Sequence, residues 1–427
     1  MLSEAWGNGS NSTAARPERR NLLSGDAMNV KRFDALPRLI YVNAVFIVGT
    51  LGTLITPAVL ESWAKLRWSQ SQLGLVAALE LATLATGSLS GLYWQRRWPW
   101  RRVALGSLLL AIFANLACVI RNDFVSVCFA RSAAGLSAGF LCAIYSAFLA
   151  NTRSPGKVIA VTNFIQIGLE ALFIFGAATV FQRLGASGLF FLLTALSLVL
   201  VPLLSLLPRG WPEGDGGEAT VHPVSRRQAS IGYVLLLAFV PYIVVQTGVY
   251  TFLGELGRLV AHLSAEQSLR IIGISVVFSS LGSVGAYVLN DRVGFALPIG
   301  CAIALTGGMI FAMIFASRSA SWFLIHISTL QIAWIALGCY LYSALIHYNN
   351  LLVPAATSLS SFGSAFGAGA VGFVLEHGGV TAIPLLTSGA MATTAMLTIP
   401  VLIRARRVEK AISPTPMAIS VPSLGLD

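Results

Sequence analysis

Residues 208–230 have the sequence PRGWPEGDGGEATVHPVSRRQAS, which is rich in Pro, Gly and charge. This is the longest polar interruption between apolar segments of the chain, and its composition is typical of a linker. A helix needs about 20 apolar residues to cross the roughly 30 Å hydrocarbon core of a bilayer. Such segments lie on both sides of the linker: 38–60, 72–93, 103–120, 127–149, 158–181 and 187–207 before it, and 231–253, 269–289, 296–316, 322–345, 354–375 and 381–403 after it.

The composition agrees with a chain that lies mostly in lipid. Only 11% of the 427 residues are charged and 56% are hydrophobic, whereas a soluble domain has about 25% charged residues. The apolar runs are long and continuous, which excludes the short alternating strands of a membrane β-barrel. The sequence therefore predicts an all-α polytopic membrane protein with twelve transmembrane helices, arranged as two pseudo-symmetric six-helix bundles.

The net charge of +11 indicates membrane topology and not a nucleic-acid partner. Most of the 28 Lys and Arg fall on the two tails and on the loops that follow every second span, starting with the loop after 72–93. By the positive-inside rule, both termini are cytoplasmic. We expect a cytoplasmic tail at 1–37, a bundle at 38–207, the cytoplasmic linker at 208–230, a second bundle at 231–403 and a cytoplasmic tail at 404–427.

A weak internal repeat relates the two halves. A shift of 195 residues places Ser69 to Gly87 on Ser264 to Gly282, and Tyr145 on Tyr340. Two bundles of the same orientation predict a solute site between them near the bilayer midplane.

Cofactor chemistry is not expected. The five Cys fall inside predicted spans without a C-x-x-C pair, and only His326 of the five His lies deep in a span. The sequence places neither a nucleophile with a base nor three metal ligands at one depth. We therefore predict that the protein is not an enzyme and that it binds no metal and no cofactor.

Several motifs resemble those of the major facilitator superfamily over residues 38–403. The loop GLYWQRRWPWRRV keeps the family's Gly91, Arg96, Arg101 and Arg102, with Gln95 in place of an Asp, and the loop GAYVLNDRVG carries Asp291 and Arg292. The resemblance implies alternating access, a gating role for these loop residues and a monomer. The segment NFIQIGLEALFIFG lacks the Gly-Pro motif of the family's drug antiporters.

Two carboxylates are candidates for proton coupling. Glu80 and Glu170 both lie inside predicted spans, at a similar depth from the midplane toward the outside. Ionisable groups there are costly and need a function or a partner. Each binds the coupling proton or, alternatively, forms a structural contact such as an ion pair with Arg131. Asn163, Gln166 and Glu170 also share one helix face, toward either the central cavity or other helices of the bundle.

The resemblance implies that the first and fourth helices of each half line the cavity. The shift of 195 residues places His326 on Arg131, and two cations facing each other would suit an anionic substrate. Aromatic walls suit amphipathic molecules equally well. The candidate substrate-binding residues are Arg131, His326, Tyr41, Asn43, Tyr145, Asn163, Gln166, Gln246, Tyr250, Tyr340 and Tyr342.

These observations favour a secondary active transporter of a small organic solute, with an organic anion preferred, driven by the proton gradient across a bacterial inner membrane. One alternative is a proton antiporter that exports drug-like or amphipathic compounds. Another is a non-transporting membrane sensor or scaffold. The expected partners are the small-molecule substrate and the lipid bilayer.

Overall fold

A computed structural model describes residues 36–64, 68–121, 123–150, 155–210, 225–349 and 352–412. Residues 1–35 and 413–427 of the predicted tails and 211–224 of the linker lie outside these ranges, whereas 404–412 of the predicted C-terminal tail belong to a helix. Within them, every regular element is a helix and no strand occurs. Ten of the described helices are long and apolar enough to cross a membrane. The all-helical prediction is confirmed, and twelve crossings stay a prediction.

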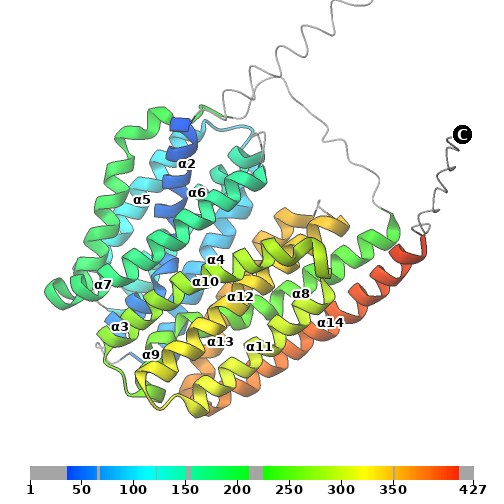
Figure 1. The fold of residues 1–427 in the computed structure, drawn as a ribbon. Helices are drawn as coiled ribbons and strands as arrows, with labels where there is room; N and C mark the ends of the chain where they lie inside the picture. Colours follow the sequence, from blue (N-terminus) through cyan, green and yellow to red (C-terminus); the bar gives the residue numbers. More distant parts are fainter. Residues whose placement is uncertain are drawn as a thin grey trace, which may run out of the picture.

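The helices fall into two sets that follow the two halves of the chain (Figure 1). The first set is α2 (Leu36–Leu54), α3 (Thr56–Ala64), α4 (Gln70–Trp94), α5 (Trp100–Ile120), α6 (Phe124–Ala150), α7 (Pro155–Leu200) and the 3₁₀ turn η1 (Pro202–Leu206). The second is α8 (Arg226–Thr251), α9 (Leu253–Ala261), α10 (Ala265–Val293), α11 (Ala296–Ala316), α12 (Ala320–Asn349), α13 (Val353–Gly378), the 3₁₀ turn η3 (Val380–Ala382) and α14 (Ile383–Ile412).

The internal repeat is visible in the way α4 and α10 begin. Ser69 caps α4 and Ser264 caps α10, each with its side chain accepting from the backbone N–H three residues on. Gln72 and Gln267 complete the two capping boxes by accepting from the backbone N–H of the cap residue. The two caps are 195 residues apart, as the sequence repeat predicts.

One predicted span is divided into a long and a short helix, and another is followed directly by a short helix. The segment 38–60 forms α2 and the nine-residue α3, and the segment 231–253 continues past α8 into the nine-residue α9. Pro57 follows the first break, and a proline lacks the N–H that would continue the helix. At the second break Phe252 leaves helical geometry, with φ −103° and ψ 12°.

The separate spans predicted at 158–181 and 187–207 are joined in one helical element, α7. Thr162 donates to Asn43, and Tyr41 donates to the carbonyl of Leu200 at 3.0 Å, so both ends of α7 contact the same turn of α2. A straight helix would place Thr162 and Leu200 more than about 50 Å apart. The element therefore folds back on itself, as the left of Figure 1 shows.

The two bundles meet near α3 and α9, at what we call the distal end, where α4 and α10 begin. At the opposite, linker end, where α5 and α8 begin, the ribbons of the two bundles diverge (Figure 1). Contacts of α4 with α13 and of α7 with α10 join the bundles. A Cβ at Gly74 in α4 would lie 2.8 Å from the carbonyl oxygen of Ala368 in α13, so this joint depends on small residues.

Within the first bundle, α4 and α6 approach closely enough to require glycine. A Cβ at Gly87 would lie 2.6 Å from the Leu136 carbonyl oxygen, and one at Gly135 would overlap the carbonyl oxygen of Glu80. The backbones of the two helices therefore pack directly on each other.

We expect Gly135→Ala to destabilise the protein by about 1–3 kcal/mol, because the added methyl has no free space in this contact. The thermal unfolding of detergent-solubilised protein, followed by tryptophan fluorescence, measures the effect. Gly307→Ala in α11 is the matched control, since nothing lies within 4 Å of its added Cβ. Equal melting temperatures for both variants would contradict the close contact.

Candidate functional site

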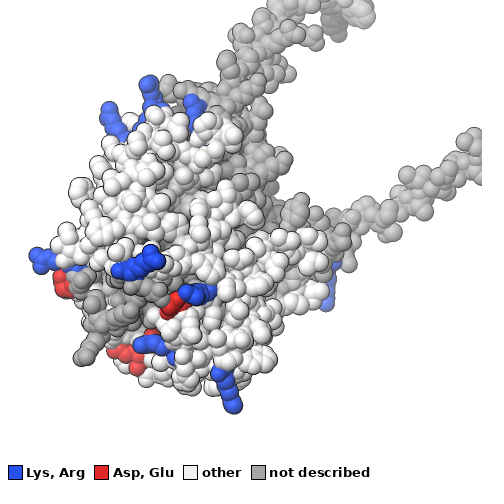
Figure 2. Space-filling view, turned by 60° about the vertical axis from the view of Figure 1, so that its left-hand side comes forward, with Lys and Arg blue, Asp and Glu red and all other residues white. Residues whose placement is uncertain are grey.

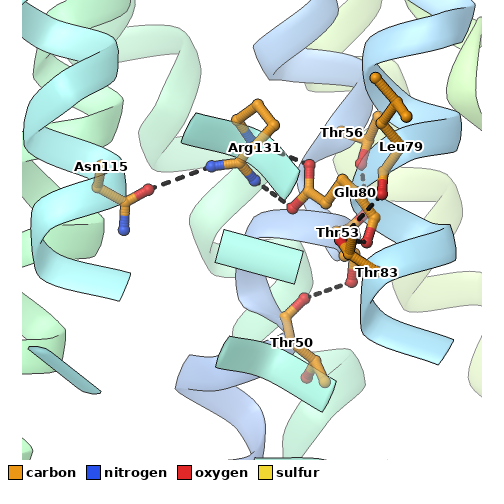
Figure 3. A network of polar contacts seen from close by, with 8 residues as sticks. All are labelled: Thr50, Thr53, Thr56, Leu79, Glu80, Thr83, Asn115 and Arg131. Atoms are coloured by element: carbon orange, nitrogen blue, oxygen red, sulfur yellow. Dashed lines mark hydrogen bonds and ion pairs between the residues drawn. The ribbon is translucent and has the colours of Figure 1, made fainter. Parts of the chain in front are cut away.

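A buried ion pair holds three helices of the first bundle together. Arg131 of α6 is 1% exposed. Its Nε donates to Oε2 of Glu80 in α4 at 2.9 Å, and its Nη2 contacts the other Glu80 oxygen. The remaining Nη1 donates to the side-chain oxygen of Asn115 in α5 at 3.2 Å (Figure 3). Glu80 and Arg131 are thus paired, which is the alternative that the sequence left open.

The surroundings of the pair leave space for it without adding another charge. A Cβ at Gly52 in α2 would lie 2.9 Å from Arg131 Nη2, so a larger residue here would displace the guanidinium from its position beside Glu80. The Phe190 ring, in the returning part of α7, lies 5.8 Å from the guanidinium carbon. The hydroxyls of nearby threonines donate to backbone carbonyls of α2, three or four residues earlier in the chain: Thr50 and Thr53 of α2, and Thr56 at the start of α3 (Figure 3). The pair is therefore a neutral, enclosed unit.

A second polar centre joins the two bundles. The hydroxyl of Tyr250 in α8 lies 2.5 Å from Oε1 of Glu170 in α7, and 2.9 Å from the carbonyl oxygen of Leu54 at the end of α2. That carbonyl is at the break before α3, where Ala58 N–H donates to Ile55 in place of Leu54. The helix break thus exposes an acceptor that Tyr250 satisfies from the other bundle.

The two centres lie at nearly the same level of α2, since Gly52 borders the ion pair and Leu54 contacts Tyr250. This agrees with the common depth expected for Glu80 and Glu170. Their environments differ: Glu80 faces an arginine of its own bundle, whereas Glu170 faces a tyrosine of the other bundle.

Polar contacts at the distal end also join the bundles, and the sequence did not predict them. Gln70 in the first turn of α4 donates to Glu255 of α9 at 3.0 Å, and Glu255 is also paired with Arg258. The backbone N–H of Ser71 donates to Glu376 of α13 at 2.7 Å. The only signal in the sequence is that these polar residues lie at helix ends.

A third cluster lies within the first bundle. Tyr145 of α6 donates to Thr162 of α7 at 2.9 Å, Thr162 donates to Asn43 of α2, and Phe46 stacks on the Tyr145 ring with centroids 4.1 Å apart. Tyr41 donates to Leu200, as described above. These predicted cavity residues are therefore bonded to one another or to backbone.

The second bundle contains polar atoms that lack partners. Tyr340 Oη and Gln331 Nε2, both on α12, are buried and have no hydrogen-bond partner within the described part of the chain. Gln246 is half-buried, and the Tyr342 ring packs on Phe239 with centroids 4.6 Å apart. Gln331 was missed by the sequence analysis, although it is a polar residue inside a predicted span.

The expected arrangement, in which Arg131 and His326 face each other as two cations, is not found. His326 Nδ1 in α12 contacts the hydroxyl of Ser317, in the turn before that helix, at 2.7 Å, and the His326 ring stacks on Trp322. Arg131 is held by Glu80 and Asn115 in the other bundle. Gln166 is half-buried, and the side chain of Asn163 lies outside the described residues.

The loop after α4 is held by hydrogen bonds to other parts of the first bundle. Gln95, which replaces the family's Asp, donates to the Ala143 carbonyl at 2.8 Å, next to Gly91. Arg101 donates to the carbonyls of Ser205 and Leu207, while Arg96 and Arg102 are exposed. The side chains of Asp291 and Arg292 lie outside the described residues. Among described residues, no three His, Cys, Asp or Glu side chains could hold a metal ion.

Comparison with known proteins identifies the class. A sequence profile of the Major Facilitator Superfamily matches residues 41–357, and the chain belongs to this family of membrane transporters. No curated protein matches the chain by sequence.

The fold is similar to that of a proton-dependent oligopeptide transporter, with a TM-score of 0.69, 10% identity, and 87% of this chain and 99% of that chain covered. It is also similar to a D-xylose–proton symporter, with a TM-score of 0.67, 14% identity, and 85% and 96% covered. A third similar structure is a bacterial homologue of the human lysosomal transporter Spinster, with a TM-score of 0.59, 13% identity, and 94% and 100% covered.

We expect Arg131→Gln and Glu80→Gln each to destabilise the protein by about 3–5 kcal/mol, because each leaves one charge buried without its partner. The double variant should recover part of this loss, since it leaves no uncompensated charge. Chemical unfolding of the purified protein in detergent gives the double-mutant cycle. Strictly additive losses would contradict a direct coupling between the two side chains.

Proposed function

We propose that this member of the superfamily is a proton-coupled secondary transporter of a small organic solute. Residues 38–207 and 231–403 rock against each other, so that a site between them faces each side of a bacterial inner membrane in turn. In this proposal the protein is a monomer with twelve transmembrane helices, both termini are cytoplasmic and the distal end faces outward. The structure is then the conformation closed toward the outside.

The contact between Glu170, Tyr250 and Leu54 carries the proposal. The number of hydrogen bonds that this contact can form depends on whether the Glu170 carboxyl is protonated. The Tyr250 hydroxyl has one hydrogen but lies within bonding distance of two acceptor groups. If Glu170 is protonated, its carboxyl donates to Tyr250 and Tyr250 donates to Leu54. If Glu170 is ionised, Tyr250 donates to the carboxylate and the Leu54 carbonyl loses its donor.

Proton binding therefore stabilises the joint between the bundles, and proton release weakens it. A buried acceptor without a donor costs free energy, about 1–3 kcal/mol in proteins. Because Tyr250 is on one bundle and both of its partners are on the other, this cost falls on the conformation that is closed at the distal end. Proton release therefore destabilises the closed conformation relative to the conformation open at the distal end. Coupling of proton binding to the conformational change requires such a difference.

Glu170 is a better candidate for the coupling proton than Glu80. Both Glu80 oxygens contact Arg131, so protonation of Glu80 would leave a buried guanidinium without its counter-ion. Tyr250 is the titratable side chain that contacts Glu170 in the described structure, and no basic group is paired with it there. The similar fold of two proton-dependent transporters also supports proton coupling.

The preferred cargo changes from the organic anion that we expected to a neutral or zwitterionic solute. Glu80 neutralises the charge of Arg131, and His326 is bonded to Ser317 near a helix end. The buried polar atoms without a described partner, on Gln331 and Tyr340, are uncharged and suit hydroxyl, amide or amine groups.

We expect Glu170→Gln to abolish proton-driven accumulation while leaving substrate exchange intact. The amide can donate to Tyr250 as the protonated carboxyl does, but it cannot release a proton. Purified protein in liposomes, with panels of peptides, sugars, organic anions and organic cations at pH 5 to 8, would first identify the cargo from currents on a solid-supported membrane. Uptake against a gradient and counterflow exchange would then be measured separately.

Glu266→Gln in the first turn of α10 is the matched control, because it makes the same chemical change at the protein's distal surface. It should accumulate substrate as the wild type does. Accumulation by Glu170→Gln at the wild-type rate would contradict the proposed coupling residue. Responses confined to amphipathic compounds, with proton flux in the opposite direction, would favour the exporter.

A further inference from the structure

A cleft of about 430 Å³ lies at the linker end of the first bundle, away from both polar centres. It is formed by the end of α4, the first turns of α5 and the middle of α6. Its lining residues are Trp94, Trp98, Pro99, Arg102, Val103, Gly106, Ser107, Leu110 and Phe140. The transport proposal makes no use of this cleft.

The floor of the cleft is one face of α5. Arg102, Gly106 and Leu110 follow each other at intervals of four residues, so they share that face. Nothing lies within 4 Å of a Cβ built on Gly106, so the absence of a side chain leaves open space there. The cleft thus leads from a charged mouth at Arg102 to an apolar part at Leu110.

Aromatic side chains form the walls. Trp94 and Phe140 pack edge to face with centroids 6.0 Å apart, and the neighbouring Trp98 is 60% exposed. Tryptophans with one apolar and one polar edge are typical of the boundary between hydrocarbon and headgroups. The cleft is therefore at the level where a lipid changes from polar to apolar.

The mouth of the cleft is basic. The Arg102 side chain is exposed and makes no hydrogen bond or ion pair with the described residues, and the exposed Arg96 and Arg97 precede it in the chain. Acidic residues with described side chains lie among the helices or near the distal end, as Glu255, Glu266 and Glu376 do. Figure 2 shows this separation: among the described residues on the visible face, the end drawn at the top has basic side chains and no acidic ones.

We propose that this cleft binds an anionic phospholipid, with the phosphate at Arg102 and the adjoining apolar part over Gly106 between the aromatic walls. The basic mouth selects a negative headgroup, and the apolar floor selects a molecule with a hydrocarbon chain. Free phosphate has the negative charge but lacks the hydrocarbon chain. The site adds a lipid to the protein's partners and does not depend on the transport proposal.

The test is lipid binding to the full-length protein in detergent, measured by native mass spectrometry with phosphatidylglycerol and with phosphatidylcholine of the same chains. Arg102→Gln removes the charge, and Gly106→Leu fills the floor. We expect each variant to bind phosphatidylglycerol about fivefold more weakly than the wild type, the equivalent of about 1 kcal/mol. The wild type should prefer phosphatidylglycerol over phosphatidylcholine by a similar factor.

Two matched controls separate this site from general effects. Gly307→Leu adds the same side chain at an open position of α11, and Arg318→Gln removes an exposed charge at the distal end. Both should bind the lipid as the wild type does, and excess inorganic phosphate should not displace it. Equal binding by all four variants, equal binding of the two lipids, or displacement by phosphate would each overturn the proposal.

Discussion

A guanidinium in the interior of a membrane protein must find its acceptors within the protein, because hydrocarbon offers none. Arg131 finds them on Glu80 and Asn115, and this one requirement fixes the mutual positions of α4, α5 and α6. Gly52 leaves space for the guanidinium, and Gly135 allows α6 to approach the backbone of α4. In the proposed mechanism the first bundle therefore moves as a unit, and the change between conformations alters the contacts between bundles.

The two halves share a scaffold but not this chemistry. The positions 195 residues after Glu80, Asn115 and Arg131 are occupied by Ser275, Ile310 and His326. Ser275 bonds to a carbonyl of its own helix and His326 to Ser317. The second bundle instead has Gln331 Nε2 and Tyr340 Oη, which are buried without a hydrogen-bond partner among the described residues, and it supplies Tyr250 to the joint. This difference suits a division of roles in which the first bundle, with its ion pair, is the structural support and the second bundle contacts the substrate through its open polar atoms.

The sequence predicted what depends on hydrophobicity and local signals. Apolar length located most helices, and the capping residues Ser69 and Ser264 lie where the repeat places them. Glu80 and Glu170 were identified because ionisable groups inside spans are rare, and Arg131 and Tyr250 because the family resemblance implies that their helices line the cavity. The ion pair of Glu80 with Arg131 was one of two open alternatives, and the contact of Glu170 with Tyr250 was not predicted. These contacts depend on helix rotation and join residues 51 and 80 positions apart along the chain. The break after α2 was missed because hydropathy continues through it.

The central claim is that a proton on Glu170 holds the distal end closed. Spin labels on a variant without native cysteines test it most directly, one pair at 121 and 318 near the distal end and another at 97 and 226 near the linker end; all four positions are exposed. Distances would be measured by pulsed electron resonance in lipid nanodiscs from pH 5 to pH 9. We predict that the distal pair moves apart and the linker pair moves together as pH rises, and that Glu170→Gln keeps the low-pH distances throughout. Distances that do not change with pH, or a Glu170→Gln variant that changes as the wild type does, would contradict the account.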